Sequence, residues 1–584
     1  MIRLTELKLA LDHSPADLSH LVYRTLGVAA ADVAQLLIFK RSYDARKVSL
    51  LVVYIVEVAL TNAALEQATL ARLAGKPHIG ATPDTTYQPP VNAPLDLPLR
   101  PVVVGFGPCG IFAALMLAQM GFKPIVLERG KKVRERTKDT WGLWRKNVLN
   151  PESNVQFGEG GAGTFSDGKL WSQIKDPRFL GRKVMQEFVK AGAPEDILIE
   201  SHPHIGTFKL VKVVENMREQ IIALGGEIRF EQRVTDLLLD ASSSREPGRT
   251  RRVRALTVLD VATNKTYELR TDHVVMALGH SARDTFAMLY RHGVFVEAKP
   301  FSIGFRIEHP QGLIDRARWG RHAGHPLLGA AEYKLVHHVE SGIAKGRSVY
   351  SFCMCPGGTV VAATSEPGRV VTNGMSQYSR NERNANAGIV VGIDPADYPT
   401  DAAAFQAAFG DTVDATLRPG DAFHPLAGIV MQRQLESKAY LLGGSTYEAP
   451  GQLVGDFIAG KASTHFGSVL PSYKPGVKLG DLSTALPDFA VAAIRDALPA
   501  FGKKIKGFDM ADAVLTGVET RTSSPLRITR TDDFQSLNVA GLYPAGEGAG
   551  YAGGILSAGV DGIRVAEAVA KSIIDHRTAN PPAS

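Results

Sequence analysis

The amino-acid sequence predicts an α/β fold built on a parallel sheet, with a smaller α/β module at the N-terminus. An apolar strand, a glycine turn, a helix and a second strand follow one another over residues 102–128. A strand–helix–strand unit of this kind has a right-handed crossover and parallel strands. Near the C-terminus the chain again runs through a strand, a glycine-rich turn and a helix, and residues 1–80 alternate strands with a helix.

The N-terminal module starts with a strand at RLTELKL and continues into a helix. Ser14 and Pro15 suit the N-cap and first turn of that helix, and Gly27 suits its end. Strands are expected at LLIFKRSYD and VSLLVVYIVEV. Residues 81–100 are rich in proline and lack periodicity, so they predict a linker.

Length, charge and cysteine usage restrict the class of protein. A chain of 584 residues is too long for one hydrophobic core and predicts several folding units. The net charge is +7 and no basic stripe interleaves with aromatic residues, so no nucleic-acid partner is expected. Three cysteines without companion ligand pairs argue against a disulfide framework and against a metal site.

The hydropathy pattern predicts a cytoplasmic protein with no membrane contact. The N-terminus has no uninterrupted apolar segment of the kind found in a signal peptide. The most apolar run, residues 48–60, is too short to span a bilayer and includes Glu57.

The stretch VVVGFGPCG carries a dinucleotide-binding motif. Gly105, Gly107 and Gly110 follow an apolar strand and open a helix, which is the context that this motif requires. The first glycine permits the turn, the second lets the backbone approach a pyrophosphate, and the third allows close packing of helix on sheet. Glu128 ends the next strand and is expected to accept ribose hydroxyls, while Cys109 is interpreted as a packing residue.

The C-terminal stretch GLYPAGEGAGYAGGILSAGVDG selects FAD over NAD. FAD is long, so its ribityl chain and flavin ring need an anchor beyond the one that holds adenosine. A strand delivers Gly546 and Glu547, whose carboxylate is expected to accept a ribityl hydroxyl. The N–H groups near Gly554 and Ile555 would face the flavin N1–C2=O edge, where a helix N-terminus stabilises negative charge.

The chain resembles the glutathione-reductase-type FAD superfamily, and within it the family called uncharacterised NAD(FAD)-utilising dehydrogenases. The likeness is carried by KRSYDARK, GFGPCG with LERG, GEGGAGTFSDGKL, FCMCPGG, VETRTSSPLRI and GEGAGYAGGI. It implies a Rossmann-like FAD-binding domain of the ββα type, an inserted α+β substrate domain and a small N-terminal ferredoxin-like α/β domain. The implied boundaries are 1–80 for the N-terminal domain, 81–100 for the linker, 101–280 for the first part of the FAD domain, 281–518 for the inserted domain and 519–584 for the second part of the FAD domain.

The resemblance also implies further cofactor contacts. The loop at residues 158–170 would run under the flavin, the alternative being a glycine-rich turn without a ligand. The additional cofactor-binding residues expected on this basis are Pro108, Arg129, Gly160, Gly161, Ala162, Thr164, Ser166, Lys169, Val234, Ala277 and Gly279.

The expected activity is that of an FAD-dependent oxidoreductase, which transfers hydride between flavin N5 and a small organic substrate. NAD(P)H is a candidate transient donor, although no second GxGxxG lies between residues 281 and 518. The CxxxxC pair of glutathione reductases is also absent. One alternative is a flavoprotein monooxygenase, whose second Asp-Gly motif is not found. Another is a non-catalytic, redox-sensing FAD module that binds a protein partner through the N-terminal domain.

Four residues are candidates for catalysis. Cys353 and Cys355 would share one face of a strand, and a strained disulfide at this spacing favours packing over a redox or substrate-facing role. Arg521 could clamp a substrate carboxylate or, equally, pair with a glutamate and brace the domain junction. His280 follows the ALG turn and is interpreted as a turn residue satisfied by backbone more than as a catalytic group.

Overall fold

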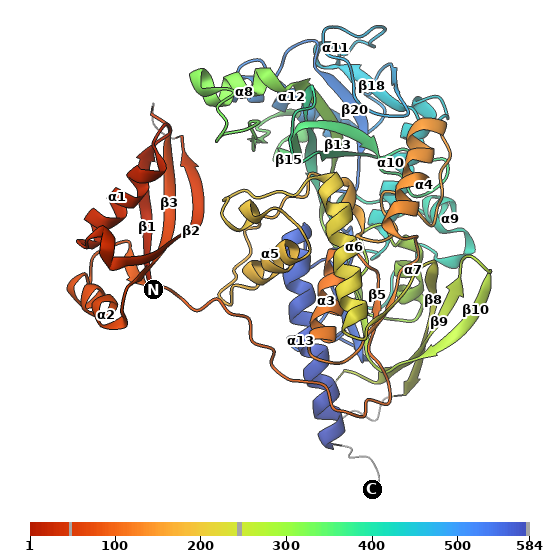
Figure 1. Ribbon diagram of the computed structural model, residues 1–584. Helices are drawn as coiled ribbons and strands as arrows, with labels where there is room; N and C mark the ends of the chain where they lie inside the picture. The colour runs from red at the N-terminus through yellow and green to blue at the C-terminus, as the bar shows by residue number, and fades with distance from the viewer. Residues whose placement is uncertain (46–48, 242–247, 580–584) are drawn as a thin grey trace. The chain divides into compact units, whose positions relative to one another are not determined.

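The computed structural model describes residues 1–45, 49–241 and 248–579, and it divides into two compact units (Figure 1). Unit 1 comprises Met1–Gln88 and Lys169–Ile205, and unit 2 comprises Pro89–Gly168 and Gly206–Ser584. Arg46 and Lys47 of the KRSYDARK motif lie outside the described residues.

The segment 169–205 corrects the expected boundaries, which placed it in the FAD domain. Its backbone pairs with the end of the long strand β2 (Val33–Asp44). The N–H of Arg41 donates to the carbonyl of Ile199 at 2.7 Å, and the N–H of Ser201 donates to the carbonyl of Arg41 at 2.9 Å. Hydrogen bonds between residues far apart in sequence therefore attach this segment to unit 1.

Unit 1 contains an antiparallel sheet in the order β2-β3-β1-β4. The predicted caps of its first helix are confirmed, because the Ser14 side chain accepts from the N–H of Asp17 and Gly27 adopts φ 63°. The other elements of this unit are β1 (Ile2–Ala10), α1 (Pro15–Leu26), β3 (Leu51–Leu60), α2 (Ala63–Arg72), β4 (Ile79–Ala81) and α5 (Leu180–Lys190). Residues 82–101, which are described throughout, contain no helix or strand.

Unit 2 contains the parallel sheet that positions the glycine motifs. Its order is β23-β11-β5-β6-β7, and every neighbouring pair is parallel. The strands are β5 (Val102–Val104), β6 (Ile125–Leu127), β7 (Glu227–Arg229), β11 (Val274–Met276) and β23 (Leu542–Pro544). Because β23 pairs with β11 and β11 with β5, the two glycine motifs reach the same edge of one sheet.

Helices and a second sheet surround these strands. The helices α3 (Pro108–Gln119) and α13 (Ile555–Ala579) cross closely, since a Cβ at Gly562 would lie 2.3 Å from the carbonyl oxygen of Cys109. The second sheet comprises β8 (Gln232–Ala241), β9 (Arg251–Asp260), β10 (Lys265–Arg270) and β22 (Val539–Ala540). The remaining helices here are α4 (Val133–Lys146), α6 (Thr207–Ala223) and α7 (Arg283–Arg291).

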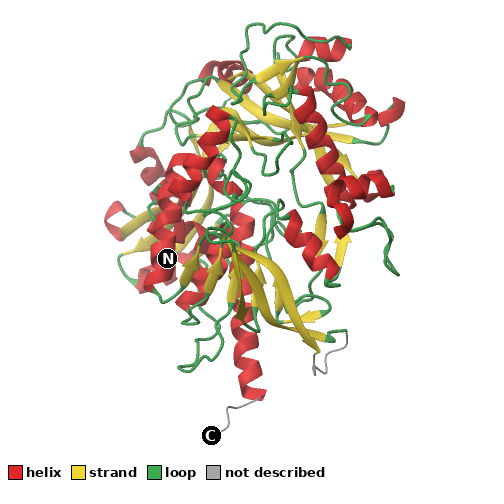
Figure 2. Cartoon of the chain, turned by 90° about the vertical axis from the view of Figure 1, so that its right-hand side faces the viewer, coloured by secondary structure: helices red, strands yellow, loops and turns green. Residues whose placement is uncertain are grey.

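A large, mostly antiparallel sheet follows in the order β14-β15-β17-β13-β20-β18-β19, with β16 paired to β15 (Figure 2). Its strands are β13 (Phe301–Pro310), β14 (Val336–His338), β15 (Ser348–Ala362), β16 (Thr372–Ser376), β17 (Asn384–Ile393), β18 (Ala449–Leu453), β19 (Val477–Leu479) and β20 (Val514–Glu519). Its helices are α8 (Gln311–Trp319), α9 (Ala402–Phe409), α10 (Ala427–Leu442), α11 (Val454–Ala459) and α12 (Asp488–Lys504). The chain enters and leaves this region side by side, through the antiparallel pair β12 (Val296–Ala298) and β21 (Leu526–Ile528).

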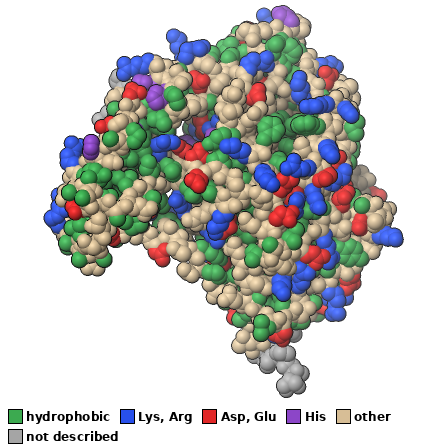
Figure 3. All heavy atoms as spheres, viewed as in Figure 1, with side chains coloured by type: hydrophobic (Ala, Val, Ile, Leu, Met, Phe, Trp, Pro, Cys, Tyr) green, Lys and Arg blue, Asp and Glu red, His purple; other side chains and the backbone are tan. Residues whose placement is uncertain are grey.

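Two general features bear on partners and membranes. On the face of unit 2 drawn in Figure 3, the side chains of Lys and Arg are interspersed with those of Asp and Glu. Among the described residues, none of the helices combines the length and the apolar character needed to cross a bilayer.

Candidate functional site

The candidate site lies at the carboxyl ends of β5, β11 and β23. The N–H of Gly548 donates to the carbonyl of Leu278 at 2.9 Å, so the C-terminal motif runs along the end of β11. Ligands of parallel sheets bind outside the carboxyl ends of the strands. The residues that follow these strand ends are therefore the ones to test for cofactor binding.

Some glycines at this edge are required by the packing of the protein itself. A Cβ at Gly110 would lie 1.9 Å from the carbonyl oxygen of Gly105, and one at Gly105 would lie 2.6 Å from that of Ala277. A Cβ at Gly546 would lie 2.8 Å from the Cβ of Cys109. Gly105 and Gly546 also have positive φ values of 99° and 73°, which glycine adopts at low cost.

At other glycines of this edge, an added Cβ would not clash with any neighbouring atom of the protein. A Cβ at Gly279 or Gly554 would meet no atom within 4 Å, and one at Gly107 would meet only the Cα of Gly161, at 3.6 Å. Gly107, Gly279 and Gly554 are absent from the residues with positive φ. The protein thus leaves room beside bare backbone at these positions, which fits the close approach of a phosphate or a flat ring.

Two helices begin at the same place. α3 starts at Pro108 and α13 at Ile555, and the first N–H groups of a helix carry partial positive charge without intrahelical partners. A Cβ at Gly163 would lie 3.1 Å from Cγ1 of Ile555 and 3.5 Å from Cγ of Pro108. The loop before Gly168 therefore passes across both helix starts.

This loop is held by backbone and contains one unsatisfied hydroxyl. The N–H of Gly160 donates to the carbonyl of Phe106 at 2.8 Å, and Ala162 begins a short 3₁₀ turn. The buried Oγ1 of Thr164 has no hydrogen-bond partner among the described residues, and such a group costs free energy until it finds one. Ser166 differs, because its hydroxyl donates to the carbonyl of Gly163 at 2.7 Å within the turn.

Glu128 is buried at the end of β6 and makes three backbone contacts. Its Oε2 accepts the N–H of Phe106 at 2.9 Å, and its Oε1 accepts those of Gly130 at 2.8 Å and Gly158 at 2.9 Å. A carboxylate has about four acceptor sites, so Oε2 can still accept a ribose hydroxyl. Glu128 therefore also ties the glycine turn to the loop, a role that the sequence analysis missed.

Of the expected cofactor residues, Arg129 forms ion pairs within the protein and Lys169 belongs to unit 1. Arg129 donates to Glu152 and to Asp284, both at 2.9 Å, and its guanidinium lies 4.1 Å from the centre of the Phe157 ring. Its contact with the cofactor stays a prediction, because in this structure its guanidinium pairs with two carboxylates. Lys169 belongs to unit 1, and its contact with the cofactor stays a prediction.

The side chains of two further expected cofactor residues, Cys109 and Val234, are buried, so these residues could contact a cofactor only through their backbone. The thiol of Cys109 packs against Gly546, and burial raises its pKa well above the ordinary value, so its sulfur does not face the open space. Val234 is buried in β8, which begins beside Glu128 because the N–H of Gln232 donates to the Glu128 carbonyl at 2.9 Å. This position suits backbone contact with the adenosine part of a dinucleotide.

Glu547 and Lys299 are two charged residues close enough for each to act on the pKa of the other. The carboxylate of Glu547 is half-buried and makes no hydrogen bond to the described residues. Burial raises the pKa of Glu547 to about 7, Lys299 opposes that rise, and Cys353 adds to it. The Nζ of Lys299 donates to Oγ of Ser523 at 3.3 Å, and burial followed by the charge of Arg527 lowers its pKa.

The two candidate thiols lie in an irregular part of β15. Cys353 has a positive φ of 43°, and the pairing of β15 with β17 shifts register on both sides of Cys355. Cys353 is half-buried and Cys355 is fully buried. The Cys355 thiol donates to the carbonyl of Cys353 at 3.4 Å, and the neighbouring Cys353 side chain, followed by burial, raises the pKa of the Cys355 thiol well above its ordinary value.

Arg306 lies behind this bulge and was missed by the sequence analysis. It is fully buried and donates at 2.9 Å both to the carbonyl of Cys353 and to Oδ1 of Asn386. Its other donors reach both oxygens of Glu519 at 3.1 Å. Burial would lower the pKa of Arg306, but Glu519 and the two thiols raise it, so the guanidinium is a fixed positive charge beside the sulfurs.

Arg521 pairs with a glutamate, as in the alternative in which it braces the domain junction and does not bind a substrate carboxylate. It donates to the Glu436 carboxylate at 3.0 and 2.8 Å, and to the hydroxyls of Ser281 at 2.9 Å and Ser365 at 2.8 Å. These contacts leave no fork for a substrate carboxylate. Glu436 lies on α10 and Ser281 follows β11, so the bond network joins the parallel sheet to the inserted region.

His280 is bound by a neighbouring side chain and not by backbone. Its Nδ1 lies 3.0 Å from Oγ of Ser281. Burial, followed by the charges of Arg521 and Arg283, lowers the pKa of His280 to about 3. The ring is therefore neutral at physiological pH and unsuited to act as an acid there.

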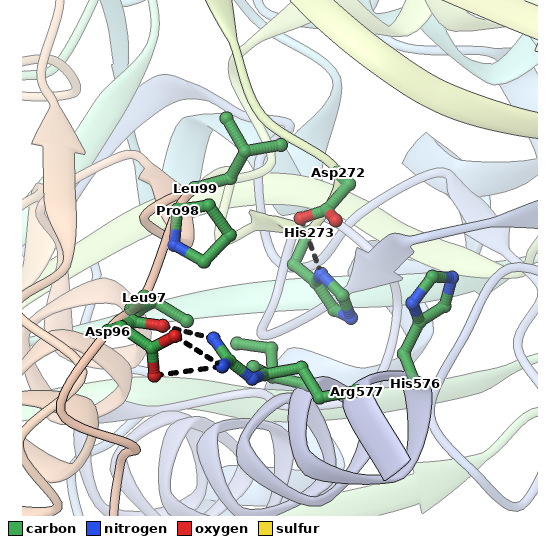
Figure 4. A pocket seen from close by; sticks show the side chains of 9 residues that line it. Asp96, Leu97, Pro98, Leu99, Asp272, His273, His576 and Arg577 are labelled. Atoms are coloured by element: carbon green, nitrogen blue, oxygen red, sulfur yellow. Dashed lines mark hydrogen bonds and ion pairs between the residues drawn. The ribbon is translucent and has the colours of Figure 1, made fainter. Parts of the chain in front are cut away.

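A separate cavity of about 510 Å³ lies at the far end of α13 (Figure 4). It is lined by Asp96, Leu97, Pro98, Leu99, Asp272, His273, Ile573, His576 and Arg577. Asp272 and His273 precede β11, so the cavity is at the opposite end of this strand from the glycine motifs. Two contacts join side chains of its lining, Arg577 with Asp96 and Nδ1 of His273 with Asp272, both at 2.8 Å.

Comparisons with known proteins identify related sequences. Residues 300–522 match a family model described as "FAD-dependent protein, C-terminal domain-like", and residues 1–59 match a domain of unknown function, DUF8436. An uncharacterized protein of Clostridium beijerinckii is 44% identical over 567 residues, which cover 97% of this chain and 98% of that protein.

Solved structures align at much lower identity. Glycerol-3-phosphate dehydrogenase from Bacillus halodurans, complexed with FAD, is 13% identical with a TM-score of 0.31, and the alignment covers 83% of this chain and 66% of that one. A geranylgeranyl bacteriochlorophyll reductase-like protein from Thermoplasma acidophilum is 11% identical with a TM-score of 0.33, covering 82% and 79%. TM-scores this low do not establish a common fold.

Proposed function

We propose that this chain is an FAD-dependent oxidoreductase acting on a small organic substrate, because it belongs to the same family as the clostridial protein and its residues 300–522 match the model described as "FAD-dependent protein, C-terminal domain-like". The observation that carries the proposal is the set of glycines that the protein does not need for its own packing. Gly107, Gly279 and Gly554 lie where two helix N-termini and the loop before Gly168 come together.

The residues present fit the two ends of FAD. Gly107 and the start of α3 take the pyrophosphate, Oε2 of Glu128 takes a ribose hydroxyl, and the hydroxyl of Thr164 gains a partner. Glu547, which makes no hydrogen bond to any of the residues that the structure describes, takes a ribityl hydroxyl. The first N–H groups of α13 would hold the flavin and would stabilise negative charge on its pyrimidine part.

When bound, the flavin supplies hydride exchange at N5, and the chain supplies position and electrostatics. Lys299 holds a positive charge near Glu547 at the place where β12 and β21 join the two parts of unit 2. The network of Arg521 and Glu436 holds the inserted region against the parallel sheet while substrate binds. NAD(P)H is the donor that we propose for the reductive step.

The finer architecture belongs to the same proposal. The sheet order β23-β11-β5-β6-β7 with the added β8–β10 sheet supports a Rossmann-like FAD domain of the ββα type. The large sheet between β12 and β21 supports an inserted substrate domain. The order β2-β3-β1-β4 with α1 and α2 supports a ferredoxin-like N-terminal domain.

Two measurements test the function. Apoprotein titrated with FAD, FMN and NAD should bind FAD far more tightly than either of the other two. Anaerobic stopped-flow mixing of the holoprotein with NADH or NADPH should then show rapid bleaching of the flavin band with one of them. A protein that holds no FAD contradicts the cofactor assignment, and FAD that neither nucleotide reduces contradicts the proposed donor.

A further inference from the structure

The strands β12 and β21 form a two-stranded ribbon that has one apolar face and one charged face. Val296, Leu526 and Ile528 are buried on the apolar face. Glu297 is exposed and Arg527 is half-buried, and these two residues alternate with the apolar ones along their strands. Because successive side chains of a strand point to opposite faces, Glu297 and Arg527 lie together on the other face.

The register of the ribbon makes Lys299 and Arg527 diagonal neighbours on the charged face. Glu297 pairs directly with Arg527, and the N–H of Lys299 donates to the carbonyl of Pro525 at 2.9 Å. Lys299 therefore follows Glu297 on the same face, two residues further along. Diagonal neighbours of an antiparallel pair are about 7–8 Å apart, within reach of long side chains. The charge of Arg527 accordingly adds to burial in lowering the pKa of Lys299.

Most hydrogen-bond donors of these two cations have no acceptor among the residues that the structure describes. The Nε of Arg527 is buried and unpartnered there, and the guanidinium pairs with Glu297 only at 3.8 Å, beyond hydrogen-bond distance. Glu297 also accepts the hydroxyl of Thr529 at 3.1 Å. Lys299 has three donors, of which one reaches Oγ of Ser523 at 3.3 Å. The face therefore carries two positive charges against one negative charge, with donors left for an anion.

The Arg527 end of this face lies against the C-terminal glycine motif. A Cβ at Gly550 would lie 3.2 Å from the Cβ of Arg527, and the guanidinium carbon of Arg527 is 5.5 Å from the centre of the Tyr551 ring. One residue further along the ribbon, the N–H of Ile528 donates to the carbonyl of Ala549 at 3.2 Å. The charged face is therefore fixed beside residues 549–551 of this motif.

The Lys299 end of the face reaches the residue that we propose to hold the ribityl chain. Ser523 accepts from Lys299, and the next residue, Ser524, donates its hydroxyl to the carbonyl of Gly548 at 2.9 Å. Burial raises the pKa of Glu547, and the charge of Lys299 opposes that rise. Both cations thus stand beside the segment that fits the flavin, where the chain passes into the inserted region.

We propose that Lys299 and Arg527 bind an anionic group of the substrate beside the flavin, so that the substrate is a small organic carboxylate or phosphate. This inference rests on the proposed function and narrows its substrate class. The planar guanidinium of Arg527 binds two oxygens of such a group, and the ammonium of Lys299 supplies a point charge. A neutral substrate leaves two neighbouring cations without a counter-charge, so this face selects against it.

The first test measures anion binding without relying on the flavin. In isothermal titration calorimetry, benzoate or phenyl phosphate should bind the protein, and the uncharged probe benzamide should not. Lys299→Met and Arg527→Met should each weaken anion binding at least about tenfold, and Arg527→Lys should recover part of that loss. The matched control is Arg254→Met, which removes an arginine of similar exposure on β9 and should change nothing. Binding of neither anion by the wild type, or unchanged affinity in both methionine variants, would overturn the proposal.

The second test asks whether the anion binds next to the flavin. Titration of the holoprotein with the anion that binds should shift the visible absorption band of the flavin, with the dissociation constant found by calorimetry. FAD affinity should change much less than anion affinity in the methionine variants. Calorimetric binding without a spectral shift, or an equal loss of FAD affinity, contradicts a substrate site and leaves the flavin assignment standing. A protein that binds no FAD contradicts the proposed function, while calorimetry still decides whether Lys299 and Arg527 bind an anion.

Discussion

Gly107 and Gly161 face each other where the glycine turn meets the loop before Gly168. A Cβ at Gly161 would lie 2.8 Å from the Cα of Gly107, whereas a Cβ at Gly107 would stand 3.6 Å from the Cα of Gly161. Gly161 also has a φ of 61°, and Gly107 has one of −81°. The packing of the protein therefore requires glycine at position 161, whereas at position 107 it leaves room for a Cβ.

Replacing Gly107 with alanine should therefore weaken FAD binding without unfolding the apoprotein. The added methyl occupies the space that backbone leaves for the pyrophosphate, and we expect affinity to fall at least about tenfold, or about 1.4 kcal/mol. Gly562→Ala is the matched control, because its Cβ would lie 2.3 Å from the Cys109 carbonyl and should lower stability by about 1–3 kcal/mol. FAD titration and thermal unfolding separate the two effects. Full FAD affinity in Gly107→Ala would contradict the placement of the pyrophosphate.

Glu547→Ala should weaken FAD binding and leave the apoprotein folded. The lost charge-assisted bond to a ribityl hydroxyl is worth about 1.5–3 kcal/mol, or roughly ten- to a hundredfold in affinity. Glu135→Ala, a change at an exposed acid on α4, should leave the affinity as it is. An unchanged affinity in Glu547→Ala would remove the second anchor of the cofactor.

The pH dependence of apoprotein stability provides an independent test of the burial of Glu547. Folding raises its pKa from 4.5 to about 7, so the folded state binds the proton more tightly than the unfolded chain. Stability from this group is full below pH 4.5 and is lost as the pH rises to about 7. In Glu547→Gln the side chain cannot ionise, so the free energy of unfolding no longer falls for this reason as the pH rises. Above pH 7 the variant should therefore be more stable than the wild type, by about 3 kcal/mol at most. Denaturant unfolding at pH 5 and pH 8 measures it, and parallel curves for the two proteins would contradict it.

Glu128→Ala should destabilise the apoprotein, in contrast to Glu547→Ala. The substitution leaves the N–H groups of Phe106, Gly130 and Gly158 without their acceptor. Each buried donor left unpaired costs about 1–3 kcal/mol. The thermal midpoint of the apoprotein should fall markedly. If it does not fall while FAD affinity drops, Glu128 serves the cofactor alone.

Arg521→Ala should destabilise unit 2 because it leaves the buried carboxylate of Glu436 short of a partner. Breaking one side of a buried ion pair costs about 3–5 kcal/mol, and Arg521→Lys should recover part of that loss because it keeps the charge but not the fork. Equilibrium unfolding in urea provides the measurement. Unfolding curves that coincide with the wild type would instead favour the substrate-clamp alternative.

His280 should contribute to acid sensitivity. Its pKa falls from 6.5 to about 3 on folding, so its share of stability is full above pH 6.5 and is lost as the pH falls below that value. His280→Asn should lose less stability between pH 7 and pH 5 than the wild type does. The pKa values of His309 and His424 are also lowered on folding, to about 4. These two residues still destabilise the variant as the pH falls, so His280→Asn should reduce the acid-induced loss of stability only in part. Equal losses in both proteins would mean that His280 is charged in the folded state.

The local sequence determined the elements whose signals lie within a few residues of each other. Gly105, Gly107 and Gly110 stand between an apolar strand and a helix, and the structure has β5 and α3 there. The caps Ser14 and Gly27 likewise predicted the limits of α1. Whether a segment forms a strand, a turn or a helix depends largely on residues that are close together in sequence, so these elements could be predicted from the sequence alone.

Only the tertiary structure decided which distant side chains meet. Arg521 and Glu436 are 85 residues apart and Arg306 and Glu519 are 213 apart, so no spacing rule links them. Pairing of segment 169–205 with β2 similarly moved a domain boundary. The bond from the Cys355 thiol to the Cys353 carbonyl lies in a bulge of β15, where the register with β17 shifts on both sides of Cys355. Ion pairs, boundaries and bulges are set by how sheets pack and pair, and those relations exist only once the chain has folded.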